Sequence, residues 1–269
     1  MIKKILNNLK NPHKIPSKLL YKIEFFYKKK IYDQSFFENK QNEIFKKLNL
    51  DRNSGLMKLK KLKENFNFLN RSMSSEHEAL FSSLSIKADL KINKILEIGT
   101  FDGANAFLLS LLFQDSNIET IDLKSDEDNF KNFYNRSDRI DEFLQLRQKN
   151  LSKSEKINFK EINSINLINF NKKYDLIWID GSHGYPMVCI DIINSLKLIN
   201  NSGFIICDDV YTNKIQSDKM YNSYAAYETL EELKKENLIN FDLIHKRLDP
   251  DSNCLEKNRK FVAIFKKVI

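Results

Sequence analysis

The sequence is poor in the residues that mark several protein classes. Only 3 of its 269 residues are cysteines, and Cys189, Cys207 and Cys254 lie far apart. An odd number of cysteines at irregular spacing does not suit a disulfide framework and fits a reducing compartment, so we expect a cytoplasmic protein. The Cys and His spacing does not resemble a zinc site either.

Long apolar runs are also missing. The longest candidate, residues 106–113, falls well short of the roughly 18 residues needed to cross a membrane, and Ser110 interrupts it. The first ten residues are basic but no apolar stretch follows them, so we expect no secretory signal. Hydrophobic residues still make up 42% of the chain and aromatic residues 12%. This content can fill a core and argues against wholesale disorder.

The positive charge is concentrated at one end of the chain. Residues 1–70 hold 17 Lys and Arg against 6 Asp and Glu, a net charge of +11, whereas residues 71–269 hold 27 against 30, a net of −3. Aromatic residues recur among the lysines at helical spacing. We therefore expect a basic helical N-terminal extension over residues 1–70 and a second domain over residues 71–269.

The pattern of apolar residues changes near residue 74. In the extension we expect helices from near Ser17, over 42–48 and over 55–69. Beyond it, Ser74 or Ser75 begins a helix, and short apolar runs then alternate with helix-length segments. The expected strands are 94–98, 118–123, 157–162, 174–180, 203–207, 241–248 and 260–268. The expected helices are 104–113, 130–149, 188–199 and 221–236. This order predicts an α/β fold with a doubly wound, mostly parallel sheet and a C-terminal antiparallel pair.

Acidic residues and glycines stand where the predicted strands end. The chain has only 6 glycines, and five lie beyond residue 95. The first strand ends in the segment Glu97-Ile98-Gly99-Thr100-Phe101-Asp102-Gly103, in which the glycines permit a tight turn before a helix. Asp122 follows the second strand, Asp180-Gly181-Ser182-His183 the fourth and Asp208-Asp209 the fifth. Ligands bind at these strand ends in parallel sheets.

Four segments in this order resemble class I S-adenosylmethionine (SAM)-dependent methyltransferases. They are ILEIGTFDG, TIDL, YDLIWIDGSHGY and GFIICDDV, and the resemblance covers about residues 74–269. It is strongest to the metal-dependent O-methyltransferases, which include catechol, caffeoyl-CoA and macrolide-sugar enzymes. The resemblance implies a Rossmann-like, seven-stranded sheet, SAM as the methyl donor, and a small-molecule hydroxyl acceptor such as a sugar or secondary metabolite.

The resemblance also implies roles for individual residues. Glu97 and Gly99, with Thr100, Phe101 and Gly103 in the same turn, match the motif that lines the methionine and ribose of SAM. Asp122 matches the acid that binds the ribose, and Asn163 lies where relatives often place an Asp beside the adenine. Asp180 is also expected among the residues that bind the cofactor.

The same resemblance implies a metal centre. Asp180, Asp208 and Asp209 match the three positions that hold a divalent cation, for which carboxylates suit Mg²⁺. His183 falls where catechol-type enzymes carry a lysine base, and we expect it to accept the hydroxyl proton. Adjacent residues of a strand point to opposite faces, so Asp208 and Asp209 can converge only if the strand ends and the chain turns.

Other readings of the sequence stay open. The basic extension suits an RNA or protein methyltransferase, and a non-catalytic binding protein could keep the same fold. A nicotinamide dehydrogenase is disfavoured because the glycine motif is G-x-x-x-G. The extension is expected to pack on the catalytic domain or on a dimer mate. Contact with nucleic acid or an anionic membrane surface is the less favoured alternative. Tyr185 and Tyr211 are candidates for the wall of the acceptor pocket.

Overall fold

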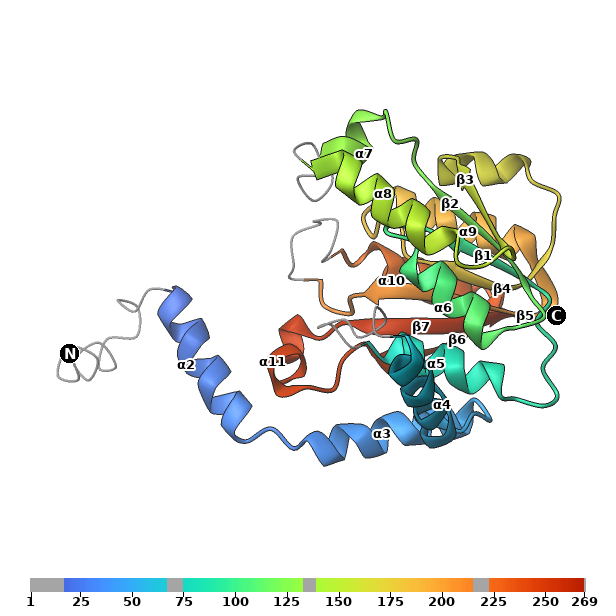
Figure 1. The fold of residues 1–269 in the computed structure, drawn as a ribbon. Helices are drawn as coiled ribbons and strands as arrows, with labels where there is room; N and C mark the ends of the chain where they lie inside the picture. The colour runs from blue at the N-terminus through green and yellow to red at the C-terminus, as the bar shows by residue number, and fades with distance from the viewer. Residues whose placement is uncertain (1–16, 67–74, 133–138, 215–222, 269) are drawn as a thin grey trace.

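The computed structural model describes residues 17–66, 75–132, 139–214 and 223–268, and its centre is one seven-stranded sheet (Figure 1). The strand order is β3-β2-β1-β4-β5-β7-β6. The strands are β1 (Lys94–Ile98), β2 (Asn117–Asp122), β3 (Ile157–Glu161), β4 (Tyr174–Ile179), β5 (Ile199–Val210), β6 (Ile239–His245) and β7 (Phe261–Lys267). β7 pairs antiparallel with both β5 and β6, and the other pairs are parallel. The predicted fold class is confirmed.

Helices cover both faces of this sheet (Figure 1). They are α2 (Ser17–Lys30), α3 (Gln34–Lys47), α4 (Arg52–Asn65), α5 (Glu76–Ser85), α6 (Ala104–Leu112), α7 (Asp128–Asn132), α8 (Ile140–Leu151), α9 (Met187–Leu198), α10 (Ala225–Lys235) and α11 (Pro250–Asn253), with the 3₁₀ turns η4 (Ser164–Asn169) and η5 (Glu256–Asn258). α9 and α10 pack on one face, whereas α5 and α6 pack on the other. Of the described part of the chain, no helix is long and apolar enough to cross a membrane.

Alternate side chains of a strand point to opposite faces of the sheet, so one strand contributes to both cores. In β4, Leu176 and Trp178 join the core under α5 and α6, while Ile177 and Ile179 join the core under α9. All four are fully buried. A strand buried on both faces reads as a continuous apolar run, and for this reason its position was predictable.

Two helices of the basic region belong to the main core. Phe45 of α3 and Leu59 of α4 are buried in the same cluster as Trp178. Gln41 of α3 is fully buried, and its side chain accepts from the backbone N–H of His245 at 3.0 Å and donates to the His245 carbonyl at 3.1 Å. Gln41 thus pairs the edge strand β6, whose backbone groups would otherwise lack a neighbour on that side. Residues 34–65 are therefore packed as part of the body that contains the sheet.

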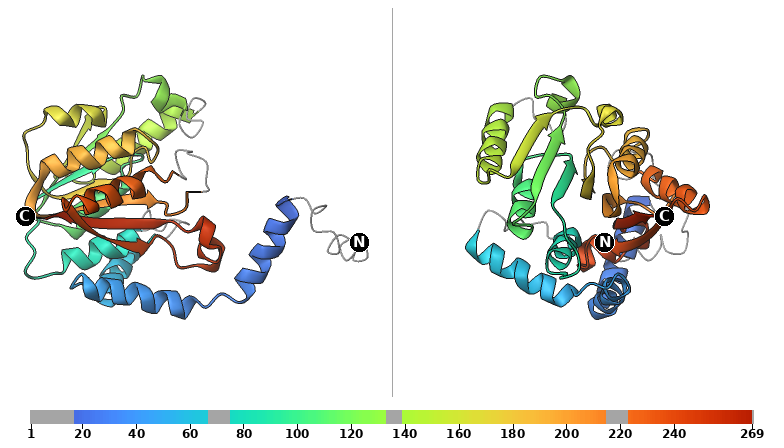
Figure 2. Two further views of the ribbon diagram at one scale, coloured as in Figure 1. Left: turned by 180° about the vertical axis from the view of Figure 1, so that it is seen from behind. Right: turned by 90° about the vertical axis from the view of Figure 1, so that its right-hand side faces the viewer.

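Helix α2 differs from α3 and α4 (Figure 2). It extends away from the sheet and leaves Phe26 and Tyr27 more than 60% exposed. It contacts the body in the region of α11 and η5. The contacts include ion pairs from Lys29 to Asp251 and from Glu24 to Lys257, and contacts of Tyr21 with Lys257 and Asn258. The predicted boundary at residue 70 stays a prediction, and of the helices before it α3 and α4 contribute to the core of the sheet.

Some element limits differ from the sequence-based expectation. The helix expected over 130–149 is two helices, α7 and α8, on either side of residues 133–138, which lie outside the described residues. The helix expected over 55–69 ends at Asn65, and residues 67–69 also lie outside the described residues. Strand β5 is longer than expected at both ends.

Candidate active site

The glycine turn after β1 lies against the turn after β4. Gly99 has a φ of +99°, and a Cβ atom at this position would lie 2.3 Å from the Asp180 carbonyl oxygen. The backbone N–H of Asp180 donates to the Ile98 carbonyl at 2.8 Å. Gly103 also has a positive φ and begins α6. Only glycine combines this conformation with so close an approach, so the two turns form one continuous surface.

Glu97 lies beneath this surface, fully buried on the α6 side of the sheet. Asn105 of α6 donates to Glu97 Oε1 at 2.7 Å, and the hydroxyl of Thr120 donates to Oε2. Thr120 is in turn 2.6 Å from the hydroxyl of Thr100. Burial raises the pKa of Glu97 to about 8, although both hydrogen bonds act to lower it. At neutral pH this carboxyl is therefore largely protonated.

Asp122 ends β2 and binds the glycine turn. Its Oδ2 accepts from the Phe101 N–H at 3.0 Å, and its Oδ1 accepts from the Leu123 N–H at 2.8 Å. Arg147 of α8 approaches Oδ2 at 3.9 Å and also pairs with Glu161 at 3.3 Å. A carboxylate has about four acceptor positions. The two backbone bonds therefore leave Asp122 able to accept further hydrogen bonds from a ligand.

Asn163, the residue expected beside the adenine, begins the η4 turn after β3. Its side-chain oxygen accepts from the Ile165 N–H at 3.1 Å. It lies after the strand next to β2, so the ends of β1, β2 and β3 bring Gly99, Asp122 and Asn163 to one edge of the sheet.

Asp180 and His183 occupy the turn after β4. His183 Nε2 lies 3.4 Å from Asp180 Oδ1 and 4.0 Å from Asp209 Oδ2. The His183 side chain is nearly fully buried, whereas that of Asp180 is 35% exposed and reachable from solvent. Burial alone would lower the pKa of His183, but hydrogen bonding to Asp180 and the charge of Asp209 raise it above its ordinary value.

A β-bulge allows the adjacent side chains of Asp208 and Asp209 to converge. In the pairing of β5 with β7, Cys207 lies opposite Ala263 and Val210 opposite Phe261, so Asp208 and Asp209 together face Val262. Asp209 adopts a left-handed φ of +52°. Such a bulge re-aims side chains without ending the strand. Both carboxylates therefore point to the same side, although β5 continues to Val210.

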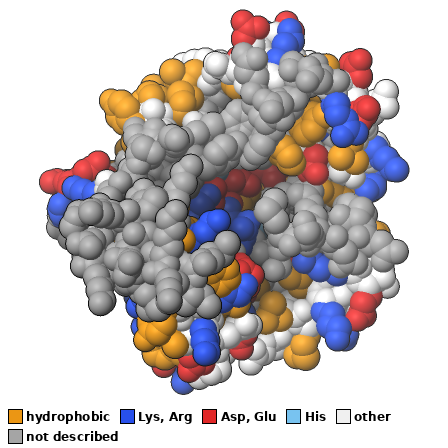
Figure 3. All heavy atoms as spheres, turned by 90° about the vertical axis from the view of Figure 1, so that its left-hand side faces the viewer, with side chains coloured by type: hydrophobic (Ala, Val, Ile, Leu, Met, Phe, Trp, Pro, Cys, Tyr) orange, Lys and Arg blue, Asp and Glu red, His pale blue; other side chains and the backbone are white. Residues whose placement is uncertain are grey.

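Two lysines bind these carboxylates. Lys246 Nζ donates to Asp208 Oδ2 at 2.5 Å and to Asp209 Oδ1, and Lys260 Nζ donates to Asp209 Oδ2 at 2.8 Å. Burial acts to raise the pKa of Asp209, but the nearby positive charges, above all Lys246, hold it well below its usual range. Burial raises the pKa of Asp208 despite Lys246. Acidic and basic side chains gather in a hollow on the face that contains these strand ends (Figure 3).

This arrangement does not fit the magnesium centre expected from the sequence. Three of the four oxygens of Asp208 and Asp209 are already bound by ammonium groups, and Asp180 is 3.4 Å from His183. Within the described ranges, no three His, Cys, Asp or Glu side chains are grouped as a metal site requires. Mg²⁺ needs free oxygen ligands. The donor set of Asp180, Asp208 and Asp209 is therefore not a preformed cation site.

Comparisons with known proteins agree with the fold and the glycine turn. Residues 96–210 match the family model of a methyltransferase domain. This part of the chain is therefore similar to a methyltransferase domain. The chain resembles the O-methyltransferase TomG from Streptomyces achromogenes, involved in tomaymycin synthesis and solved with SAM. The TM-score is 0.53 at 15% identity, over 89% of this chain and 100% of that one.

Two further solved structures match with TM-scores below 0.5. The SAH-bound methyltransferase PaMTH1 from Podospora anserina has a TM-score of 0.48 at 17% identity, over 71% of this chain and 79% of that one. The SAH-complexed O-methyltransferase from Bacillus cereus has a TM-score of 0.45 at 15% identity, over 66% and 74%. A search of curated protein sequences finds no match.

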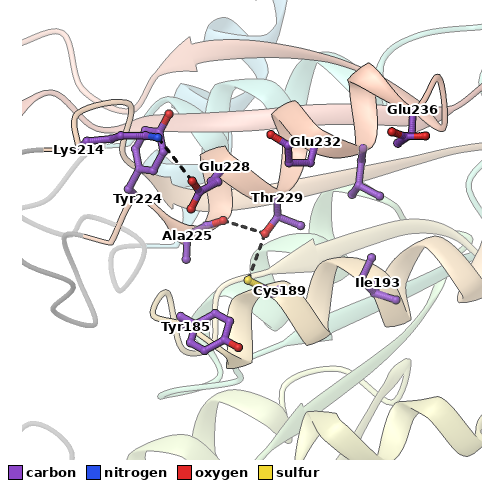
Figure 4. A pocket seen from close by; sticks show the side chains of 11 residues that line it. Tyr185, Cys189, Ile193, Lys214, Tyr224, Ala225, Glu228, Thr229, Glu232 and Glu236 are labelled. Atoms are coloured by element: carbon purple, nitrogen blue, oxygen red, sulfur yellow. Dashed lines mark hydrogen bonds and ion pairs between the residues drawn. The ribbon is translucent and has the colours of Figure 1, made fainter.

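A separate groove of about 700 Å³ lies on the outer side of the sheet, between α9 and α10 (Figure 4). Tyr185, Cys189 and Ile193 line one wall, and Glu228 and Glu232 the other. Tyr185 is 72% exposed. The groove does not include the acidic residues of the strand ends.

The two tyrosines proposed as pocket walls are placed very differently. Tyr185 lies at the end of the outer groove, whereas Tyr211 is buried after β5, where burial raises its pKa. Neither position tests contact with an acceptor, so both stay predictions.

Three residues of the candidate site were not predicted from the sequence. Arg147 comes from the middle of α8, and Lys246 and Lys260 flank the turn between the last two strands. The order and direction of the last strands indicate where the two lysines lie. β6 runs parallel to β5 and β7 runs antiparallel to it, so the end of β6 and the start of β7 lie at the same edge as Asp208.

Proposed function

We propose that this methyltransferase transfers the methyl group of SAM to a hydroxyl group of a small molecule. SAM lies across the ends of β1 and β2, and the acceptor lies over the ends of β4 and β5. The observation that carries this proposal is the contact between the two turns. Gly99 packs against the Asp180 backbone, and His183 Nε2 lies 3.4 Å from the Asp180 carboxylate. A methyl donor at the first turn would thus lie beside a proton acceptor at the second.

The cofactor half of the site offers hydrogen-bond acceptors and close backbone approach. Bound SAM supplies an electrophilic methyl group on a positively charged sulfur. Asp122 is the residue for the ribose hydroxyls, because its backbone partners at Phe101 and Leu123 hold it at the strand end and leave acceptor capacity. Thr100 and Phe101 complete the turn, and Asn163 lies at the adenine end. Glu97 supports this surface from below through Asn105 and Thr120.

His183 is the proton acceptor in this proposal. The acceptor hydroxyl gives its proton to His183, its oxygen forms a bond to the methyl carbon, and the carbon–sulfur bond breaks with its electron pair left on sulfur. Asp180 orients the imidazole and stabilises the imidazolium that results. The hydrogen bond to Asp180 and the charge of Asp209, which raise the pKa of His183, make the imidazole a stronger proton acceptor. Holding both reactants at adjoining turns supplies proximity and orientation.

The first experiment is calorimetric titration of the full chain with S-adenosylhomocysteine in buffer containing EDTA. We expect binding in the micromolar range, which corresponds to about −8 kcal/mol. An acceptor screen with SAM then begins with sugars and catechols, with release of S-adenosylhomocysteine as the readout. Folded protein that does not bind S-adenosylhomocysteine would refute the assigned cofactor half.

A variant tests the role of His183 once an acceptor is found. His183→Gln should lower turnover by roughly 10²- to 10⁴-fold, the usual contribution of a general base. Lys235→Met, whose lysine pairs with Glu232 on the exposed surface of α10, is the control and should retain wild-type turnover. A loss of less than about threefold in His183→Gln would remove His183 from the mechanism.

A further inference from the structure

The ammonium group of Lys246 lies between two buried carboxylates at the end of β5. It binds Asp208 Oδ2 at 2.5 Å and Asp209 Oδ1 at once, and Lys260 binds the remaining Asp209 oxygen at 2.8 Å. The Lys246 side chain is only 12% exposed. A single positive charge is therefore shared by two carboxylates at the position where the sequence predicted a divalent cation.

Hydrogen bonds on both sides fix the backbone of Lys246, and the two carboxylates hold its ammonium group. The Lys246 N–H donates to the Lys260 carbonyl at 2.9 Å, which continues the pairing of β6 with β7. The Lys246 carbonyl accepts from the Glu76 N–H at 2.9 Å, at the first residue of α5. Glu76 is held in turn by two bonds from Arg52, at 2.7 and 2.8 Å. Lys246 is thus anchored from the sheet and from the helical layer.

This anchoring opposes a metal ion at the same carboxylates. A divalent cation would have to displace Lys246 from Asp208 and Asp209 and leave a buried ammonium without its partners, which is strongly unfavourable. If the lysine stayed, the cation would lie beside two like charges, Lys246 and Lys260. The residues that match metal ligands in the O-methyltransferases are in this chain neutralised by its own side chains.

We infer that Lys246 takes the place of the divalent cation, and that its ammonium group holds the acceptor oxygen for methyl transfer without a metal. This inference rests on the proposed function. Lys246 donates one hydrogen bond to each of two carboxylates, and an ammonium group has three donors. The third N–H is the one that binds the acceptor oxygen, and Lys246 remains protonated throughout. Lys260 is a positioning residue, because it balances the charge of Asp209.

The test measures binding of Mn²⁺ alone to the full chain, by electron paramagnetic resonance of the free ion. The proteins are wild type, Lys246→Met and the control Lys235→Met, whose lysine pairs with Glu232 on the exposed surface of α10. Wild type and the control should bind Mn²⁺ weakly and equally. Lys246→Met frees two carboxylate oxygens, one on Asp208 and one on Asp209, and should bind Mn²⁺ at least about tenfold more tightly. A variant with a merely structural loss would not gain this affinity.

Two outcomes would overturn the inference. One is tight, one-to-one Mn²⁺ binding by wild type that Asp208→Asn abolishes. The other is a folded Lys246→Met with wild-type Mn²⁺ affinity. If circular dichroism shows that Lys246→Met does not fold, Lys246→Arg keeps the charge, and turnover of this variant and of wild type should be unchanged by EDTA. If EDTA abolishes turnover and Mg²⁺ restores it, the inference about Lys246 is refuted. S-adenosylhomocysteine titration of the same samples reports separately on the proposed function.

Discussion

The two halves of the sheet edge stabilise their buried carboxyl groups by different means. At the ends of β1 and β2, Glu97 is bound by a hydroxyl and an amide, and Asp122 by two backbone N–H groups. At the end of β5, Asp208 and Asp209 are bound by two ammonium groups. Burial raises the pKa of Glu97, and its neutral donors do not offset this, so Glu97 stays protonated at neutral pH. The positive charges of the lysines lower the pKa of Asp209 and keep it ionised.

This difference suits the two ligands proposed for the edge. A cofactor with a positively charged sulfur needs acceptors and close approach, and a fixed ammonium beside it would repel it. An acceptor hydroxyl that is losing its proton needs a positive charge nearby. The cofactor half and the acceptor half are therefore distinguished by the charge of the partners around similar acidic residues.

The largest expected effect concerns the protonated state of Glu97. The folded protein holds this proton up to about pH 8, while the unfolded chain releases it near the ordinary value of 4.5. The contribution of Glu97 to stability is thus full below pH 4.5 and is lost as the pH rises toward 8. Glu97→Gln has no proton to lose. The wild-type free energy of unfolding, relative to this variant, should fall by about 4 kcal/mol across that window.

Urea unfolding of both proteins at pH 5, 6.5 and 8 measures this difference. Because the two chains share every other titrating group, including buried His245 whose pKa is lowered to about 4, the subtraction isolates Glu97. Parallel curves for wild type and variant would mean that Glu97 is ionised in the fold, and the contrast between the two halves would be lost.

The second prediction concerns the ionised state of the acceptor half. Asp209→Asn keeps a residue that tolerates the left-handed conformation but removes the charge that balances Lys246 and Lys260. We expect a loss of about 3 kcal/mol in the free energy of unfolding, typical of a broken buried pair. Glu232→Gln breaks the exposed pair with Lys235 and should change stability by less than about 0.5 kcal/mol. Equal effects in the two variants would show that the buried pair does not stabilise the fold.

The third prediction separates ligand binding from stability. Asp122→Asn should weaken S-adenosylhomocysteine binding by roughly 10- to 100-fold, because hydrogen bonds to a charged group are worth about 1.5–3 kcal/mol. Asp126→Asn, on the exposed turn that follows β2, should bind like wild type. Calorimetric titration of wild type, Asp122→Asn, Asp126→Asn and Asp209→Asn gives the affinities. If Asp209→Asn lowers this affinity more than Asp122→Asn does, the division of the edge into two halves is wrong.

Much of the cofactor half could be predicted from the sequence because its signals are local. The run from Ile95 to Gly103 contains a buried strand, its turn and the start of its helix. β1 has the limits that the apolar run predicted. A pair of glycines beside an acid in so glycine-poor a chain indicates a backbone requirement, which the positive φ values of Gly99 and Gly103 explain.

The acceptor half could not be predicted in the same way, because its contacts join residues far apart in sequence. Lys246 reaches Asp208 across 38 positions, and Lys260 reaches Asp209 across 51. Knowledge of which strand lies beside β5 is needed before these lysines point to the edge. The bulge at Asp208 and Asp209 also has no local sequence signal, since it depends on their pairing with β7.

The smallest effect is expected from removal of the first 30 residues. This deletion takes away α2, which contacts the body through exposed Tyr21 and through surface ion pairs worth about 0–1 kcal/mol each. S-adenosylhomocysteine affinity should stay within about twofold of wild type, since that change is below 0.5 kcal/mol. Removal of residues 1–65 is the contrasting deletion. It strips Phe45, Leu59 and the Gln41 pairing from the core, and it removes Arg52, which holds Glu76 against Lys246. We expect this longer deletion to give insoluble protein. A soluble product that binds S-adenosylhomocysteine normally would show that α3 and α4 are dispensable, and that the cofactor half is stable without the layer that anchors the acceptor half.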